Sequence, residues 1–293
     1  MRRLVLSVLL CGLAYGEAPP NLAERIASHT RRPELAPGQE AGVEVSFPGA
    51  AGILKGFLFK PKGHGPFPAL LWNHGSEKNP GTQPELAAFY NAKGFVFFIP
   101  HRSGQGRSPG KYIVDTTDEY KKEHPGDVDG FRKEAVRLHD VANADVQAAV
   151  SWLSARPFID KNRIVMSGCS YGGIQTVLSA EEAMGVLAFV PFAPAAMSWA
   201  NVELRKRLIT AIHSARAPIF LLQAQNDYSI GPSEVLGPAI RAKGGPNAAK
   251  LYPVFGTTPQ QGHAAFACWN IGTEVWGSDV TEFINTALAA SQK

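Results

Sequence analysis

Short, uninterrupted runs of apolar residues recur along this chain, with longer segments between them. Runs of this kind, without polar alternation, are typical of strands that are buried on both faces of a sheet. They predict strands at 69–72, 95–99, 164–166, 186–190, 219–222 and 251–255. The segments between them predict helices at 84–93, 131–154, 172–182, 232–243 and 274–290. Alternating strands and helices indicate an α/β fold with a mainly parallel sheet that helices cover on both faces.

The residues before this repeat have a different pattern. Residues 43–47 and 53–59 each alternate between apolar and polar positions, and a Pro-Gly-Ala-Ala-Gly turn separates them. This pattern predicts an N-terminal antiparallel hairpin, which brings the sheet to about eight strands. Residues 17–41, which are rich in proline, alanine and charge, are predicted to be an extended or partly helical arm. A single domain is expected over 42–293.

Two stretches depart from the strand-and-helix repeat. Residues 111–130 are polar and rich in turn-forming residues, and we predict a long surface loop there. Residues 195–215 lie between two sheet strands and carry apolar residues at helical spacing. We predict that they form a small helical excursion over the carboxyl edge of the sheet.

The first 16 residues have the pattern of a secretory signal peptide. Arg2 and Arg3 precede an apolar run at 4–13, and small residues at 14–16 allow cleavage after Gly16. The apolar run is too short to cross a bilayer, so no stable membrane insertion is expected. We therefore predict a secreted or periplasmic protein.

Composition and charge narrow the classes of function. The 293 residues are 45% hydrophobic and 18% charged, which is typical of a globular protein. The formal charge is +4 without a cluster of basic residues, which argues against a nucleic-acid partner. No set of His, Cys and carboxylate residues has metal-ligand spacing, and the Gly-Gln-Gly at 104–106 lacks the context of a nucleotide site. We expect neither a metal nor another cofactor.

The stretch from Arg163 to Gly173 has the order of strand, tight turn and helix. Its apolar residues lead into a Gly-X-Ser-X-Gly turn centred on Ser170. A nucleophile elbow requires this order, because its sharp, strained turn lifts the serine out at the end of the strand. Gly168 and Gly172 would let the strand and the helix approach closely. We predict that Ser170 is a nucleophile; an ordinary glycine-rich turn is the alternative.

A nucleophilic serine needs a base, and the base needs an orienting carboxylate. Asp227 lies just past the predicted strand at 219–222, and His263 lies in a predicted loop after the last strand. This order along the chain is the one that accompanies an elbow, and no other histidine follows Asp227. We therefore predict a Ser170–His263–Asp227 triad. A turn or helix-cap aspartate and a surface histidine are the alternatives.

Acyl transfer also needs donors for the negative charge that develops on the carbonyl oxygen. We expect one donor to be the N–H of Tyr171, directly after the nucleophile. The other is expected to be the N–H of Ser76, in the Asn-His-Gly-Ser loop that follows the strand at 69–72. For the adjacent Glu77, a salt bridge to a nearby Lys or Arg is favoured over contact with substrate.

Two cysteines, Cys169 and Cys268, lie outside the predicted signal peptide. An oxidising compartment would permit a disulfide between them. Two cysteines are also what chance supplies, and Cys169 could be a packed thiol within the elbow. The sequence leaves both interpretations open.

Together these motifs resemble those of the α/β-hydrolase superfamily, over about residues 42–290. The similarity is greatest to its dienelactone-hydrolase and prolyl-oligopeptidase-like branch. It rests on the three predicted triad residues and on three further stretches: Ser170 within Gly-Cys-Ser-Tyr-Gly-Gly, Asp227, His263, the Asn-His-Gly at 73–75, the Arg-Ser-Gly-Gln-Gly-Arg-Ser at 102–108 and the predicted helix at 145–153. Dienelactone hydrolases use a cysteine nucleophile, whereas a serine occupies that position here. Prolyl oligopeptidases carry a propeller domain, for which the residues before 42 are too few.

These observations predict a serine hydrolase that acts on a small-molecule carboxylic ester through an acyl-enzyme. A peptidase or amidase with the same triad is the first alternative. A non-catalytic member that only binds ligands is the second, and the intact set of triad positions argues against it.

Overall fold

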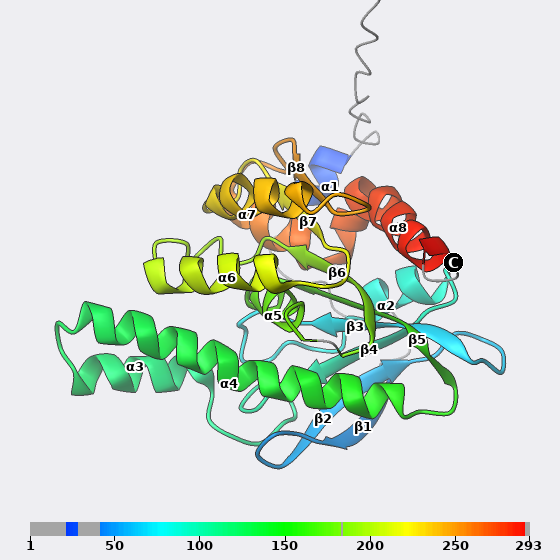
Figure 1. Cartoon of the computed structure of the whole chain (residues 1–293), viewed down its shortest axis with the longest axis horizontal. Coiled ribbons are helices and arrows are strands. Elements are labelled where there is room, and N and C mark those ends of the chain that lie inside the picture. Colours follow the sequence, from blue (N-terminus) through cyan, green and yellow to red (C-terminus); the bar gives the residue numbers. More distant parts are fainter. Residues whose placement is uncertain (1–21, 29–41, 183, 291–293) are drawn as a thin grey trace, which may run out of the picture.

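The computed structural model describes residues 22–28, 42–182 and 184–290. The predicted signal peptide and most of the predicted arm lie outside these residues. The described residues form an eight-stranded sheet in the order β1-β2-β4-β3-β5-β6-β7-β8 (Figure 1). Its strands are β1 (Val43–Pro48), β2 (Ile53–Phe59), β3 (Phe67–Asn73), β4 (Val96–His101), β5 (Ile159–Cys169), β6 (Val186–Phe192), β7 (Phe220–Ala224) and β8 (Ala248–Tyr252).

Strand β2 pairs antiparallel with both β1 and β4, and the other neighbours in the sheet pair in parallel. The predicted N-terminal hairpin and the predicted mainly parallel α/β sheet are therefore confirmed. The helices are α1 (Leu22–Ser28), α2 (Pro84–Asn91), α3 (Ile113–Glu123), α4 (Val128–Ser154), α5 (Tyr171–Ser179), α6 (Val202–Ser214), α7 (Gly231–Ala242) and α8 (Thr273–Ala290), with a π-helix η1 (Gln261–Ala265) and a short 3-10 helix η2 (Asn270–Gly272).

Helices cover both faces of the sheet, so two hydrophobic cores form. One core lies under α2 and α8 and also takes in Leu22 and Ile26 of α1. The other lies under α4, α5, α6 and α7. Successive residues of β3 enter opposite cores, with Leu70 in the first and Leu71 in the second. This arrangement explains why the inner strands are continuous apolar runs.

The prediction of a long loop at 111–130 is wrong. This stretch forms α3 and the start of α4, and the two helices make a hairpin that projects from the rest of the molecule (Figure 1). Helix α3 buries no residue, so its sequence lacks the apolar stripe by which a helix is recognised. The Asp127 side chain accepts a hydrogen bond from the Gly130 N–H at 2.8 Å and caps α4, which begins three residues before its predicted start.

Two further predictions need correction. Residues 202–214 are helical as expected, but α6 packs beside α4, α5 and α7 on one face of the sheet, not over the carboxyl edge. The last strand lies at 248–252 instead of 251–255. Pro253 has no N–H for the ladder, and β8 is an edge strand whose first residues are only partly buried, so no apolar run marks its start.

The structure joins Cys169 and Cys268 by a disulfide whose cysteines are almost fully buried. The two residues are 99 positions apart in the sequence. In the chain-entropy account, a cross-link that closes a loop of this size stabilises the native state by about 4–5 kcal/mol.

We expect the double variant Cys169→Ala/Cys268→Ala to lose several kcal/mol of unfolding free energy, up to about 4–5 kcal/mol, because its unfolded chain gains loop entropy. Urea denaturation of this variant and of the wild type measures the difference. Thiol counting on the denatured, unreduced wild type without residues 1–16, and therefore without Cys11, is the control. Two free thiols per chain would show that the cysteines do not pair.

Candidate active site

The carboxyl end of β5 and the start of α5 form a strained elbow at Ser170. Ser170 has φ 57° and ψ −117°, a conformation that non-glycine residues rarely adopt. Its N–H donates to the Phe192 carbonyl at 3.0 Å, which ties the elbow to β6. A methyl group on Gly172 would lie 1.9 Å from the Asn73 carbonyl oxygen, so only glycine fits between α5 and β3. The predicted strained turn is confirmed. A methyl group on Gly168 would lie 2.7 Å from the Gly172 carbonyl oxygen, which confirms the predicted close approach of β5 and α5.

The structure brings Ser170, His263 and Asp227 into one hydrogen-bonded chain. His263 Nε2 lies 2.8 Å from Ser170 Oγ, and His263 Nδ1 lies 2.8 Å from Asp227 Oδ1. The side chain of Asp227 is fully buried and that of His263 is 6% exposed. With the proton on Nδ1 donated to the carboxylate, Nε2 is free to accept the serine proton.

Asp227 is held by donors that sequence reasoning missed. Its Oδ1 also accepts from the Tyr228 N–H at 2.7 Å, and its Oδ2 accepts from Gln223 Nε2 at 2.8 Å. The Gln223 amide is itself fixed, because its Nε2 donates to the Ser229 carbonyl while its Oε1 accepts from the Ser233 hydroxyl. The carboxylate therefore keeps one oxygen aimed at the imidazole.

His263 lies in the π-helix η1, whereas the sequence predicted a loop. Asn226, next to Asp227, connects this region to the end of β7. Its amide nitrogen donates to the carbonyls of Phe255 and Thr258, both at 3.0 Å, and its oxygen accepts from the Phe255 N–H at 2.9 Å. These bonds fix the segment that leads to His263 relative to Asp227.

Helix α1 packs against the same region. Gln261 Nε2 donates to the Ile26 carbonyl at 3.1 Å, and Gln261 Oε1 accepts from the Thr257 N–H at 2.7 Å. Arg25 of α1 pairs with Glu274 at the start of α8. The first turn of η1 is thus held from both sides.

The two expected oxyanion donors lie at the ends of neighbouring strands β3 and β5. Ser76 is exposed in the loop after β3, and Tyr171 is the first residue of α5. The N–H groups in the first turn of a helix have no intrahelical partner, so that of Tyr171 is available to a ligand. Near the adjacent Glu77, Lys78 pairs with Asp115 and Arg107 pairs with Glu44.

A buried polar cluster beside Tyr171 contains Arg102, from the loop after β4, and His139, from α4. The Arg102 guanidinium carbon lies 4.9 Å from the centroid of the Tyr171 ring, and the His139 ring lies 4.4 Å from it. Burial lowers the pKa of Arg102 to about 10, so Arg102 remains charged at neutral pH. Burial and, to a smaller extent, the Arg102 charge lower the pKa of His139 to about 3.

The lowered pKa of His139 predicts that the protein loses stability in acid. Between its folded pKa near 3 and the unfolded value near 6.5, only the unfolded chain binds the proton, so unfolding becomes easier as the pH falls through this window. Lowering the pH from about 7.5 to about 4.5 should therefore reduce the free energy of unfolding by about 2–3 kcal/mol through His139 alone. Urea denaturation at both pH values should show a smaller acid loss for His139→Gln than for wild type. Equal losses of stability in the variant and the wild type would contradict the lowered pKa of His139.

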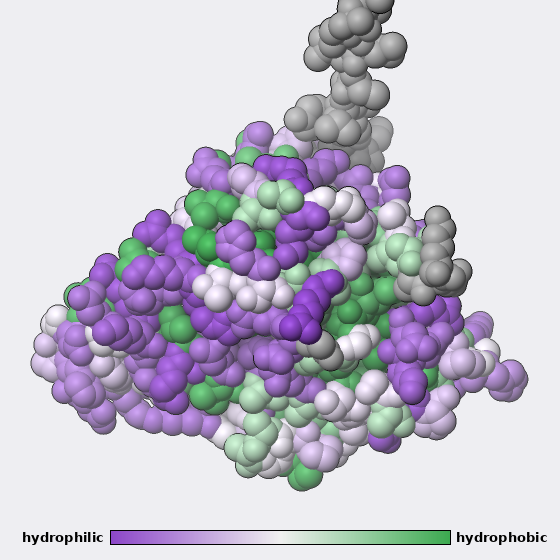
Figure 2. All heavy atoms as spheres, viewed as in Figure 1, coloured by the Kyte–Doolittle hydropathy of each residue, from purple (hydrophilic) through white to green (hydrophobic). Residues whose placement is uncertain are grey.

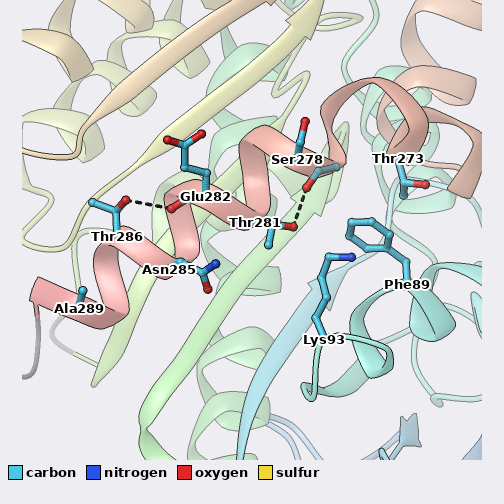
Figure 3. Close-up of a pocket in the computed structure, with 10 residues that line it drawn as sticks. Phe89, Lys93, Thr273, Ser278, Thr281, Glu282, Asn285, Thr286 and Ala289 are labelled. Carbon is cyan, nitrogen blue, oxygen red and sulfur yellow. Dashed lines mark hydrogen bonds between the residues drawn. The ribbon is translucent and has the colours of Figure 1, made fainter. Parts of the chain in front are cut away.

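A surface groove with a volume of about 700 Å³ lies between α2 and α8 (Figure 3). Its lining includes Phe89, Lys93, Thr281 and Asn285, and none of the predicted site residues belongs to it. The face of the molecule that carries the α3–α4 hairpin is mainly hydrophilic (Figure 2). Within the described ranges, no helix is long and apolar enough to cross a membrane, and no group of His, Cys, Asp and Glu could hold a metal ion.

The fold and the site together define the class of this protein. A mainly parallel eight-stranded sheet with a serine elbow after β5 is the arrangement of the α/β-hydrolases. A family model gives the particular branch: residues 53–234 match the X-Pro dipeptidyl-peptidase (S15) family, and the protein belongs to this family. The resemblance to the α/β-hydrolase superfamily is thereby confirmed. No match to a curated protein was found.

Solved structures share this fold at low sequence identity. An acylaminoacyl peptidase in complex with Z-Gly-Gly-Phe-chloromethyl ketone has a TM-score of 0.61 and 15% identity, with 83% of this chain and 41% of that chain covered. Pyrococcus horikoshii acylaminoacyl peptidase has a TM-score of 0.62 and 14% identity, with 89% of this chain and 43% of that chain covered. The Pyrococcus furiosus esterase Pf2001 has a TM-score of 0.58 and 18% identity, with 88% of this chain and 96% of that chain covered.

The chain thus spans about two-fifths of the peptidase chains and nearly all of the esterase chain. The family match makes the protein a member of a serine hydrolase family, the S15 peptidases, and these structures show that it shares the fold of acylaminoacyl peptidases and of an esterase.

Proposed function

We propose that this protein hydrolyses carboxylic esters, with Ser170 as the nucleophile, His263 as the general base and acid, and Asp227 as the orienting carboxylate. The observation that carries the proposal is the pair of 2.8 Å contacts that link Ser170 Oγ, His263 and Asp227. A buried carboxylate and a serine on a strained elbow are the two further requirements of this chemistry, and both are present.

In the proposed reaction, Ser170 Oγ attacks the acyl carbonyl carbon while His263 Nε2 takes its proton. The N–H groups of Ser76 and Tyr171 stabilise the negative charge that develops on the carbonyl oxygen. When the tetrahedral intermediate collapses, the bond to the leaving alcohol breaks and His263 donates its proton to that alcohol. A water molecule, deprotonated by His263, then attacks the acyl-enzyme and releases the carboxylic acid.

A peptidase activity is the second candidate. The S15 family match and the acylaminoacyl peptidase folds favour it, whereas the coverage of the esterase chain over 96% of its length favours an ester substrate. The two activities share one triad and differ in the leaving group, which is an alcohol in one case and an amine in the other.

A substrate panel distinguishes the candidates. We expect the mature protein to hydrolyse p-nitrophenyl acetate and butyrate with a higher kcat/KM than X-Pro p-nitroanilides. The opposite order would make the protein a peptidase. If a fluorophosphonate probe labels the protein but neither the esters nor the anilides are hydrolysed, Ser170 remains the proposed nucleophile and both substrate classes are excluded.

We also propose that the protein is exported. The buried Cys169–Cys268 disulfide supports this proposal, because structural disulfides persist in oxidising compartments. Removal of residues 1–16 would lower the formal charge from +4 to +2. N-terminal sequencing of the protein purified from its source is the test, and a chain that still begins at Met1 would contradict the proposal.

A further inference from the structure

The loop after β3, which carries Ser76, is held by hydrogen bonds to four consecutive backbone carbonyls. Arg102 Nη2 donates to the carbonyls of His74 at 2.8 Å and Gly75 at 2.6 Å. The Tyr112 hydroxyl donates to the Ser76 carbonyl at 2.6 Å. Gln105 Nε2 donates to the carbonyls of Gly75 at 3.3 Å and Glu77 at 2.8 Å.

Holding a carbonyl also aims the N–H of the same peptide unit. In a planar trans peptide the C=O and the N–H point in opposite directions, so the bond from Arg102 to the Gly75 carbonyl turns the Ser76 N–H away from the guanidinium. Among the described residues, no acceptor takes a hydrogen bond from this N–H. A positive charge on the carbonyl side further polarises the peptide and strengthens its N–H as a donor.

The same guanidinium reaches the other expected donor. It packs against the ring of Tyr171, whose backbone N–H follows the nucleophile, and Arg102 is only 2% exposed. Its Nε donates to Gln105 Oε1 at 3.2 Å, which keeps the two side chains of the 102–105 turn together. One buried side chain therefore contacts both segments that carry the expected oxyanion donors.

We propose that Arg102 is a positioning residue for oxyanion stabilisation, and that it acts through the peptide unit of Gly75 and Ser76 and through the Tyr171 ring. This inference rests on the proposed function. A planar fork is needed for this role, because one Arg102 nitrogen donates to two carbonyls, a second nitrogen bonds Gln105, and the guanidinium carbon lies over the Tyr171 ring. Lysine offers only a point charge at the end of a flexible chain.

The test measures ester hydrolysis by Arg102→Met and Arg102→Lys beside the wild type. Misplacing one oxyanion donor should lower kcat by about 10²–10³-fold, with KM changed less than about threefold. A trifluoromethyl ketone, whose adduct with the nucleophile places a negative oxygen at the same site, should lose affinity by the same factor as kcat/KM. A purely structural role for Arg102 would not couple these two losses.

Arg207→Met is the matched control. Arg207 is a partly buried arginine of α6 that pairs with Glu181 and Asp140, and it has no contact with the site. We expect this variant to lose stability while it keeps the wild-type kcat. If Arg102→Met does not fold, Gln105→Met replaces it, with an expected fall in kcat of about tenfold because the Gly75 and Glu77 carbonyls lose a donor.

Each outcome supports or overturns the inference. A folded Arg102→Met variant with kcat within about threefold of wild type overturns it, as does a fall in kcat without a fall in inhibitor affinity. Unchanged kcat in Gln105→Met overturns it if Arg102→Met is not available in folded form. If Ser170→Ala keeps wild-type turnover, the proposed function fails and this inference fails with it. If Ser170→Ala loses activity while the Arg102 and Gln105 variants keep it, the proposed function stands and only the inference about Arg102 fails.

Discussion

Replacing Ser170 by alanine should lower kcat for p-nitrophenyl esters by about 10⁴-fold or more and abolish labelling by a fluorophosphonate. The reason is that no acyl-enzyme can form without Oγ. His263 would keep its bond to Asp227, so the remaining activity would come from water and from the oxyanion donors alone. Ester turnover and labelling, measured on the same preparations, provide the test.

Ser167→Ala is the matched control for this change. Ser167 is a buried serine of β5, three residues before Ser170, and its hydroxyl donates to the Val190 carbonyl at 2.9 Å. Its loss should cost about 1 kcal/mol of stability and leave kcat unchanged. Activity in Ser170→Ala within about tenfold of wild type would exclude Ser170 as the nucleophile.

Replacing Asp227 by asparagine should lower kcat by about 10⁴-fold at neutral pH, although the side chain keeps its shape. The new amide nitrogen must replace one of two acceptors. At the Oδ2 position it would face the Gln223 Nε2 donor, whose orientation the Ser229 and Ser233 contacts fix. At the Oδ1 position it would donate to His263 Nδ1, which moves the imidazole proton to Nε2. That tautomer cannot accept the proton of Ser170.

The kinetic test for Asp227→Asn pairs kcat with the rate of fluorophosphonate labelling, since both require the deprotonated Nε2. Asp279→Asn is the control, because Asp279 accepts from Lys250 and from the Tyr252 hydroxyl away from the site. A labelling rate near that of wild type in Asp227→Asn would assign Asp227 to a turn instead of the triad.

Much of this site was predictable because chain order and sheet geometry constrain it. Ser170, Asp227 and His263 each follow a predicted strand, and parallel strands bring their carboxyl ends to one edge. The strand runs are visible in the sequence because both faces of the sheet are covered. Predictions of this kind fail where a segment has one exposed side, as for helix α3 and the edge strand β8.

The support of the site was not predictable for a different reason. Arg102 and Gln105 bind backbone carbonyls of a loop about 27–30 residues away, and such contacts leave no periodic trace in the sequence. Asn226 and Gln223 flank Asp227 closely, but side-chain amides are common near strand ends and carry no signal of their own. The π-helical turn at His263 depends on Gln261 and α1, which meet only in the folded chain.

The disulfide also determines which pieces of the chain stay together after a cut. Ser170, Asp227 and His263 all lie inside the covalent ring that Cys169 and Cys268 close. The exposed turn at 243–245, between α7 and β8, is the kind of site that proteases nick. A nick there would place Ser170 and Asp227 on one polypeptide and His263 on the other. The sulfur bridge would still hold these two polypeptides together, so the nicked protein would lose chain continuity without losing a member of its proposed triad.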